Sequence, residues 1–162
     1  MDQRITKMLA VAVLALAVAA GGSVLAAAPA DGVMTPIKIF IDDFNKGDTA
    51  GAEAAHVADV SIIDEVPPHA WHGATAFKDW AAAIEKDAKA HGQTEQKVTL
   101  GRTIRSQVDG DTAYVVMAAT FTYKEQGKAM VEPAQMAFAL RKDGGAWKIA
   151  AWTWAGTKPH GA

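Results

Sequence analysis

Apolar residues at helical spacing mark the part of the chain that follows residue 35. The first stripe recurs at i, i+3, i+4 and i+7 and consists of Ile37, Phe40, Ile41 and Phe44. Thr35-Pro36 predicts the start of this helix, because a hydroxyl can cap the first turn and proline is tolerated at the first helical position. Gly47 predicts its end, and Asp48 is expected to cap a second, short helix that ends near His56.

A third helix and a short strand are predicted between residues 59 and 92. The strand is the apolar run that begins at Asp59 and ends in the two carboxylates of Asp64 and Glu65. The helix carries its apolar stripe between Phe77 and Ala88, and His91-Gly92 predicts its end.

From Thr94 onward apolar and polar residues alternate, a period of two that is typical of β-strands. Four strands are predicted, at about 97–108, 112–123, 129–141 and 146–155, joined by short turns. Pro133 in the third strand predicts a bulge or an edge position, because proline donates no hydrogen bond to a neighbouring strand. This order predicts an α+β fold: a cone-shaped, curved antiparallel sheet with three N-terminal helices packed on its concave face.

Such a cone encloses an internal pocket, and apolar pockets of this kind are typical small-molecule sites. In the last strand Ala150, Trp152 and Trp154 are expected on one face, and the intervening Trp147, Ile149 and Ala151 on the other. Asp64 ends a strand of isoleucine and valine, where scarcity of water raises the pKa of a carboxyl group. It is therefore a candidate general base; the alternative is that Asp64 and Glu65 are solvated loop residues.

The composition excludes several classes of site. The chain has 162 residues, a formal net charge of -2 and no cysteine, so disulfides, thiol catalysis and cysteine-ligated zinc are excluded. No basic run is present, and nucleic acid is not an expected partner. His69-x-x-His72 lacks a third ligand at a telling interval, so we expect no metal. No nucleotide fingerprint or phosphate loop is present, and no cofactor is expected.

The N-terminus predicts export. Arg4 and Lys7 precede an uncharged apolar run at 8–20, and Val24-Leu25-Ala26 is typical of a signal-peptidase site. Cleavage after Ala30, or an uncleaved membrane anchor, are the alternatives. We therefore predict a signal peptide at 1–26, a disordered segment at 27–34 and one domain at 35–157. The product would be periplasmic or secreted, without a membrane contact after cleavage.

Four local features together resemble the nuclear transport factor 2-like superfamily, which includes steroid delta-isomerases and SnoaL-like polyketide cyclases. They are Phe44-Asn45-Lys46-Gly47-Asp48, the strand 59–64, Trp71-His72-Gly73 and Gly145-Ala146-Trp147-Lys148-Ile149. The resemblance extends over about residues 35 to 156. It implies a homodimer formed through the face of the sheet.

The steroid-isomerase branch uses an aspartate base together with a tyrosine and a protonated aspartate that stabilise an oxyanion. By resemblance, Asp64 matches the base, whereas the tyrosine position falls at Phe40, which has no hydroxyl. The second aspartate falls at about Gln135 or Met136, of which only Gln135 donates hydrogen bonds. The expected ligand-binding residues are Phe40, His69, Trp71, Tyr123, Gln135, Trp152 and Trp154.

Three functions fit this pattern. The first is a module that binds a small, largely apolar molecule without chemistry. The second is a cofactor-free isomerase, cyclase or hydratase that uses Asp64 as general base. The third is an association domain whose open sheet face pairs with another copy or a partner.

Overall fold

The structure is a computed structural model that describes residues 32–162. The predicted signal peptide, and residues 27–31 of the segment predicted as disordered, lie outside the described residues. The three helices are α1 (Met34–Lys46), α2 (Thr49–Ala54) and α3 (Ala76–His91). The strands are β1 (His56–Ile63), β2 (Ala70–His72), β3 (Gln93–Asp109), β4 (Thr112–Glu125), β5 (Lys128–Asp143), β6 (Ala146–Gly156) and β7 (His160–Gly161).

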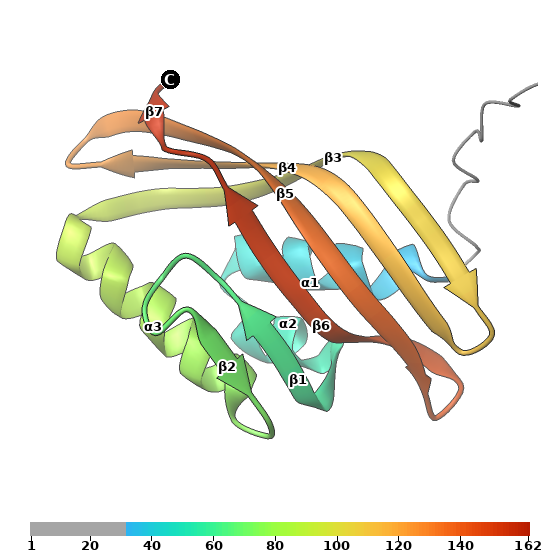
Figure 1. Cartoon of the computed structure of the whole chain (residues 1–162). Helices are drawn as coiled ribbons and strands as arrows, with labels where there is room; N and C mark the ends of the chain where they lie inside the picture. Colours follow the sequence, from blue (N-terminus) through green and yellow to red (C-terminus); the bar gives the residue numbers. More distant parts are fainter. Residues whose placement is uncertain (1–31) are drawn as a thin grey trace, which may run out of the picture.

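One curved, unclosed sheet carries the fold, with the strand order β2-β1-β6-β5-β4-β3 and the short β7 paired with β5. The four long strands form the expected antiparallel meander. β1, however, pairs parallel with β6, and this makes the sheet mixed. All three helices lie on the same side of the sheet (Figure 1). The α+β architecture predicted from the periodicity is confirmed.

The helix ends follow local backbone chemistry. Gly47 and Gly92 end α1 and α3 in the left-handed region, with φ of 75° and 65°, where glycine carries no steric cost. Asp48 caps α2 as expected, since its side chain accepts a hydrogen bond from Gly51 N at 2.9 Å. Thr35 is not the cap of α1. The helix begins at Met34 and the capping position is the fully buried Val33, whose side chain makes no capping bond.

Pro133 lies at a local edge of β5 and not in a bulge. The β4–β5 pairing runs through Thr120 and Pro133 without a register shift. The Pro133 carbonyl faces the other side, where it accepts from Thr157 N at 3.0 Å, just past the end of β6. In an antiparallel strand the nitrogen of a residue points to the same side as its carbonyl. The nitrogen of Pro133 therefore points toward Thr157 and away from β4, so its lack of an N–H removes no hydrogen bond between β4 and β5.

A register shift between β5 and β6 changes the face of one predicted core residue. Leu140 pairs with Ile149 and Ala139 with Ala151, which leaves Ala150 as an extra residue. Ile149 and Trp152 are consequently both buried, at 0% and 3% exposure, although strict alternation puts them on opposite faces. The core lies between this concave face and the helices. No helix among residues 32–162 has the length and apolar character that a membrane crossing requires.

Candidate functional site

A cavity of about 90 Å³ lies between the concave face of the sheet and helices α1 and α3. This volume holds roughly six water molecules, which is enough for part of a small ring compound. Seven aromatic residues line the cavity, among them Phe40, Trp80, Phe121, Tyr123, Trp152 and Trp154. Four carboxylic residues, Asp64, Glu65, Asp87 and Glu132, complete the lining together with two glutamines and several aliphatic side chains. The site is therefore an aromatic chamber with carboxyl groups in its wall.

Asp64 directly follows β1 and continues the inward-facing positions of Val60 and Ile62, both of which are buried. The residue is 9% exposed. Its Oδ1 accepts from Val66 N and its Oδ2 from Trp80 Nε1, each at 3.1 Å. Burial raises the pKa of Asp64, while the hydrogen bonds from Val66 and Trp80 oppose the rise because they favour the charged form. Asp64 is thus a fixed carboxyl group that accepts a proton more readily than a solvated aspartate.

Glu132 on β5 is a second buried carboxyl group, which the sequence analysis missed. It is 1% exposed and accepts from Trp154 Nε1 at 3.0 Å. Its position was readable from the sequence, since Glu132 occupies the same alternating face as Ala134 and Met136. A charged residue on an otherwise apolar face is an unusual arrangement that points to a site.

Glu65, which is exposed to solvent on one side, and the buried Glu132 both line the cavity, and their carboxyl groups interact as one pair. Burial, and then the negative charge of Glu132, raise the pKa of Glu65 to about 8. Burial also raises the pKa of Glu132, against the hydrogen bond from Trp154 that favours its charged form. Two carboxyl groups this close ionise one after the other, so the pair retains a proton near neutral pH.

Gly156 provides the space that this carboxyl pair occupies. A Cβ at residue 156 would lie 2.7 Å from Trp154 Nε1 and 2.8 Å from Glu65 Oε2, and would run into Glu132 Oε1. Only glycine at the end of β6 leaves room for the two carboxyl groups in their present positions.

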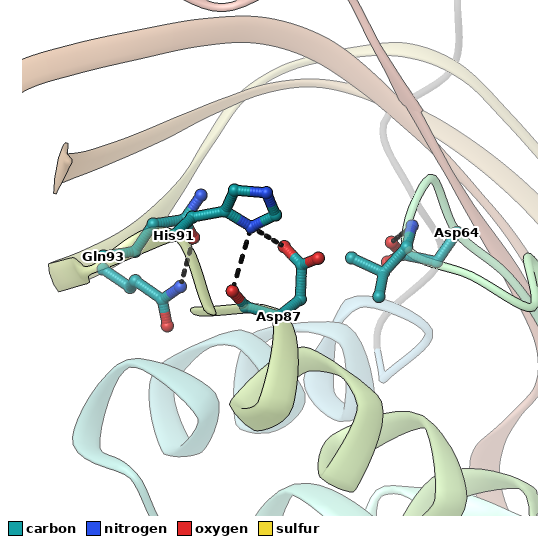
Figure 2. A network of polar contacts seen from close by, with 6 residues as sticks. Asp64, Asp87, His91 and Gln93 are labelled. Atoms are coloured by element: carbon teal, nitrogen blue, oxygen red, sulfur yellow. Dashed lines mark hydrogen bonds and ion pairs between the residues drawn. The ribbon is translucent and has the colours of Figure 1, made fainter. Parts of the chain in front are cut away.

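Asp87 and Gln93 come from the last turn of α3 and the start of β3, and both line the cavity. Figure 2 shows them beside His91, with Asp64 on the other side of Asp87. The Nδ1 of His91 lies 3.0 Å from the Asp87 carbonyl and 3.3 Å from its carboxylate. The Asp87 backbone and charge raise the pKa of the exposed His91. Asp87 thus has a basic partner.

Five of the predicted site residues come together at the cavity, and three do not. Asp64, Phe40, Tyr123, Trp152 and Trp154 all line it. His69 is exposed in the loop after β1, and the buried Trp71 on β2 packs in the hydrophobic core instead. Gln135 is exposed on the outer face of β5, because strand alternation turns its neighbour Met136 inward. The only hydrogen-bond donor expected on that strand is therefore absent from the cavity.

Trp152 leaves one polar atom of the cavity wall without a partner. The residue is 3% exposed, and its Nε1 is buried without an acceptor among residues 32–162. A buried indole N–H usually finds a partner, so this unpaired donor is unusual. The described part of the chain contains no group of three or more His, Asp or Glu residues with the geometry of a metal site.

The chain matches one protein family, and its fold is similar to several solved structures. The model of the SnoaL-like domain matches residues 33–153. A ketosteroid isomerase-like protein from Erwinia carotovora atroseptica SCRI1043 superimposes with a TM-score of 0.61 at 18% identity, over 78% of this chain and 95% of that one. Hexachlorocyclohexane dehydrochlorinase LinA-type3 from Novosphingobium barchaimii LL02 gives a TM-score of 0.68 at 10% identity, over 81% and 88% of the two chains. At these identities the two structures establish the fold alone. No curated protein sequence gives a significant match.

Proposed function

The chain belongs to the SnoaL-like family of the nuclear transport factor 2-like superfamily, and from this premise we propose that it catalyses a cofactor-free proton transfer. Its substrate is a small, largely apolar molecule held in the aromatic cavity, and Asp64 is the general base. The reaction is an isomerisation or an elimination. Structural neighbours described as isomerase-like and as a dehydrochlorinase support this class of chemistry.

The observation that carries the proposal is the position of Asp64. Its carboxylate is fixed by two hydrogen bonds at the wall of an aromatic cavity, and burial raises its pKa. A base is most effective when its pKa lies near the working pH. A molecule that fills the aromatic cavity would displace water from it, which strengthens the interaction of that molecule with the carboxylate.

In the proposed step the carboxylate of Asp64 takes a proton from a carbon of the substrate. The electron pair of the broken C–H bond forms a carbon–carbon double bond. In an elimination the leaving group departs with its own bonding pair. In an isomerisation the new double bond displaces the π pair of an adjacent carbonyl onto its oxygen, giving an enolate conjugated with the substrate's own double bond. That pair then returns to re-form the carbonyl, the double bond shifts, and its far carbon takes the proton back from Asp64, so the net composition is unchanged.

Binding without chemistry is the second candidate, and a specific observation favours it. Phe40 occupies the position of an expected oxyanion donor and has no hydroxyl, and Gln135 points away from the cavity. Loss of one such donor lowers catalysis by roughly 100- to 1,000-fold. A molecule held only by the aromatic wall would then remain unchanged.

Deuterium exchange separates these two candidates. The protein is incubated in deuterium oxide with a panel of small cyclic and aromatic ketones, and incorporation at carbon is measured by mass spectrometry. We expect incorporation with at least one compound and a loss of roughly 100- to 10,000-fold in Asp64→Asn. Glu85→Gln, which removes an exposed carboxyl of α3, is the control and should retain activity. Compounds that change tryptophan fluorescence without exchanging deuterium would support binding alone.

Export and dimerisation are further proposals. Export rests on the charge and apolar pattern of residues 1–26. For the dimer, small side chains lie side by side on the outer face of the sheet, where Val116 pairs with Ala137 and Ala139 with Ala151. This face of small apolar side chains suits a second copy of the chain, and it also suits the association role. Native mass spectrometry is expected to detect a dimer, and a monomer at high concentration would reject it.

A further inference from the structure

The charged groups of the cavity wall are all acidic. Asp64 follows β1, Glu65 belongs to the next loop, Asp87 to α3 and Glu132 to β5, and the lining contains no lysine, arginine or histidine. Asp87 is paired with His91 outside the cavity. The ion pairs formed by residues 32–162 do not include Asp64, Glu65 or Glu132. Two buried carboxyl groups, Asp64 and Glu132, and the exposed Glu65 therefore line one apolar chamber without forming an ion pair.

Such an arrangement is costly, because buried charges in proteins are normally paired. Burial raises the pKa of all three carboxyl groups. The negative charges of Glu132 and Asp64 raise the pKa of Glu65 further, and that of Asp64 raises the pKa of Glu132, whereas the contacts of Glu132 with Trp154 and Glu65 lower its pKa. Two kinds of positive charge relieve this cost: protons taken from solution, or a cationic group on a bound molecule.

The walls around the glutamate pair favour an organic cation over a metal ion. Glu132 lies directly opposite Phe121 in the β4–β5 pairing. Phe121 stacks on Tyr123 at 5.0 Å between ring centres and meets Trp154 edge to face at 6.2 Å. Aromatic faces attract ammonium groups. The described residues offer no cluster of metal ligands, so carboxyl groups spread along an aromatic wall fit an extended cation better.

Trp152, which lines the cavity, carries a further unusual polar group. Its indole N–H is buried in the cavity wall and has no acceptor among the described residues. The aromatic and acidic lining of the cavity therefore suits a ligand with an apolar body and a positive group.

We propose that the cavity selects a small organic cation, an aromatic or alicyclic amine or quaternary ammonium compound, whose positive group lies against Glu65 and Glu132. This inference rests on the proposed function, since it names the class of substrate for the same cavity. Asp64 does not belong to this glutamate pair. It remains the general base, with its carboxylate held by the hydrogen bond from Trp80.

Cation binding at this pair depends on pH. A cation competes with the proton that Glu65 and Glu132 retain, so its affinity rises with pH through the titration of the pair, by at most about tenfold per pH unit for one proton. The other ionisable groups that act on the pair are Asp64, Asp87 and Tyr123, with His69 acting on Asp64. A neutral ligand of the same shape has no such competition.

The test compares phenyltrimethylammonium, which has a permanent charge, with its neutral isostere tert-butylbenzene. Binding to the full domain is followed by tryptophan fluorescence and calorimetry between pH 6 and 9. We expect the cation to bind at least about tenfold more tightly, as one charge-assisted contact in a partly buried site provides. Its affinity should rise with pH, whereas that of the isostere should stay constant.

Two variants locate the charge. Glu132→Gln keeps an acceptor for Trp154, and Glu65→Gln changes a residue at the rim, so both are compatible with folding. Each should weaken the cation about tenfold without affecting the isostere, while the surface control Glu85→Gln should change neither. Equal affinity for cation and isostere, or no effect of either variant, would overturn the inference.

The failure of this inference and that of the proposed function are distinguishable. Asp64-dependent deuterium exchange on neutral ketones, with no preference for the cation, would retain the base and reject the cationic substrate. Tight cation binding, together with an Asp64→Asn variant that keeps full activity, would retain the cationic ligand and reject Asp64 as the base.

Discussion

The indole Nε1 of Trp80 donates a hydrogen bond to Asp64 Oδ2 at 3.1 Å, across 16 positions of sequence. This bond ties α3 to the end of β1 and fixes one oxygen of the candidate base. It also favours the charged form, and so limits the rise in pKa that burial causes. The helix therefore both orients the carboxylate and keeps it ionised often enough to accept protons.

Replacing this donor should cost more than the loss of ring volume. Trp80→Phe leaves a buried carboxylate with one hydrogen bond fewer, and bonds to charged groups contribute about 1.5 to 3 kcal/mol. Trp152→Phe is the matched control, because it removes an indole from the same cavity whose N–H has no partner. Urea unfolding at pH 7 should show Trp80→Phe to be the less stable variant by about that amount. Equal free energies of unfolding would mean that the bond to Asp64 contributes nothing.

Gly156→Ala should disturb the glutamate pair. The added Cβ would run into Glu132 Oε1 and lie 2.8 Å from Glu65 Oε2, so the two carboxyl groups must separate. We expect a loss of roughly 1 to 3 kcal/mol, as for overpacking in a core, and a lower pKa of Glu65. Gly161→Ala, where a Cβ meets nothing within 4 Å, is the control. Thermal unfolding of the two variants tests this, and similar melting temperatures would contradict it.

The glutamate pair should make the protein less stable as pH rises. The pKa of Glu65 is raised from 4.5 to about 8 in the folded state, so the folded protein binds more protons than the unfolded chain between these values. The contribution of Glu65 to the free energy of unfolding is therefore fully present below pH 4.5 and is lost as pH rises through 8. Glu65→Gln should flatten this slope in urea titrations from pH 5.5 to 8.5. An unchanged slope would show that the pair does not retain its proton.

His56 should act in the opposite direction, at acid pH. Burial between Phe40 and Phe77 lowers its pKa from 6.5 to about 4, although its Nδ1 bonds the Ala52 carbonyl. The unfolded chain binds the proton first, so stability is present above pH 6.5 and is lost as pH falls through 4, by roughly 3 kcal/mol in total.

The replacement His56→Leu tests that slope, and the exposed His160→Gln is its control. Urea unfolding between pH 4 and 7 should show a shallower dependence on pH in His56→Leu alone. A slope equal to that of the unchanged protein would contradict the assignment to His56.

Periodicity predicted most of the fold because its signals are local. The apolar stripes, Gly47 and Gly92 determine where two of the helices end, and alternation determines the four long strands. The parallel pairing of β1 with β6 was not predictable in this way, because it depends on which distant strands meet. No pattern in the sequence predicts the extra residue at Ala150 either. This residue places Ile149 on the opposite face from the one expected.

The candidate site was predictable in part for a related reason. Asp64 stands at the end of an apolar strand, and the same reasoning applied to β5 identifies Glu132. The assignment by resemblance instead led to Gln135 or Met136, of which Gln135 lies on the outer face and Met136 lines the cavity but carries no hydrogen-bond donor. Side-chain alternation was therefore the better guide to the acidic residue within this strand.

The central claim is that Asp64 is a buried carboxyl group whose pKa is raised for proton transfer. NMR titration of the protein labelled with ¹³C at aspartate carboxyl groups measures this directly, with Asp64→Asn to assign the resonance. We expect a pKa above the ordinary value of about 3.9. A pKa at or below that value would contradict it and remove Asp64 as the base.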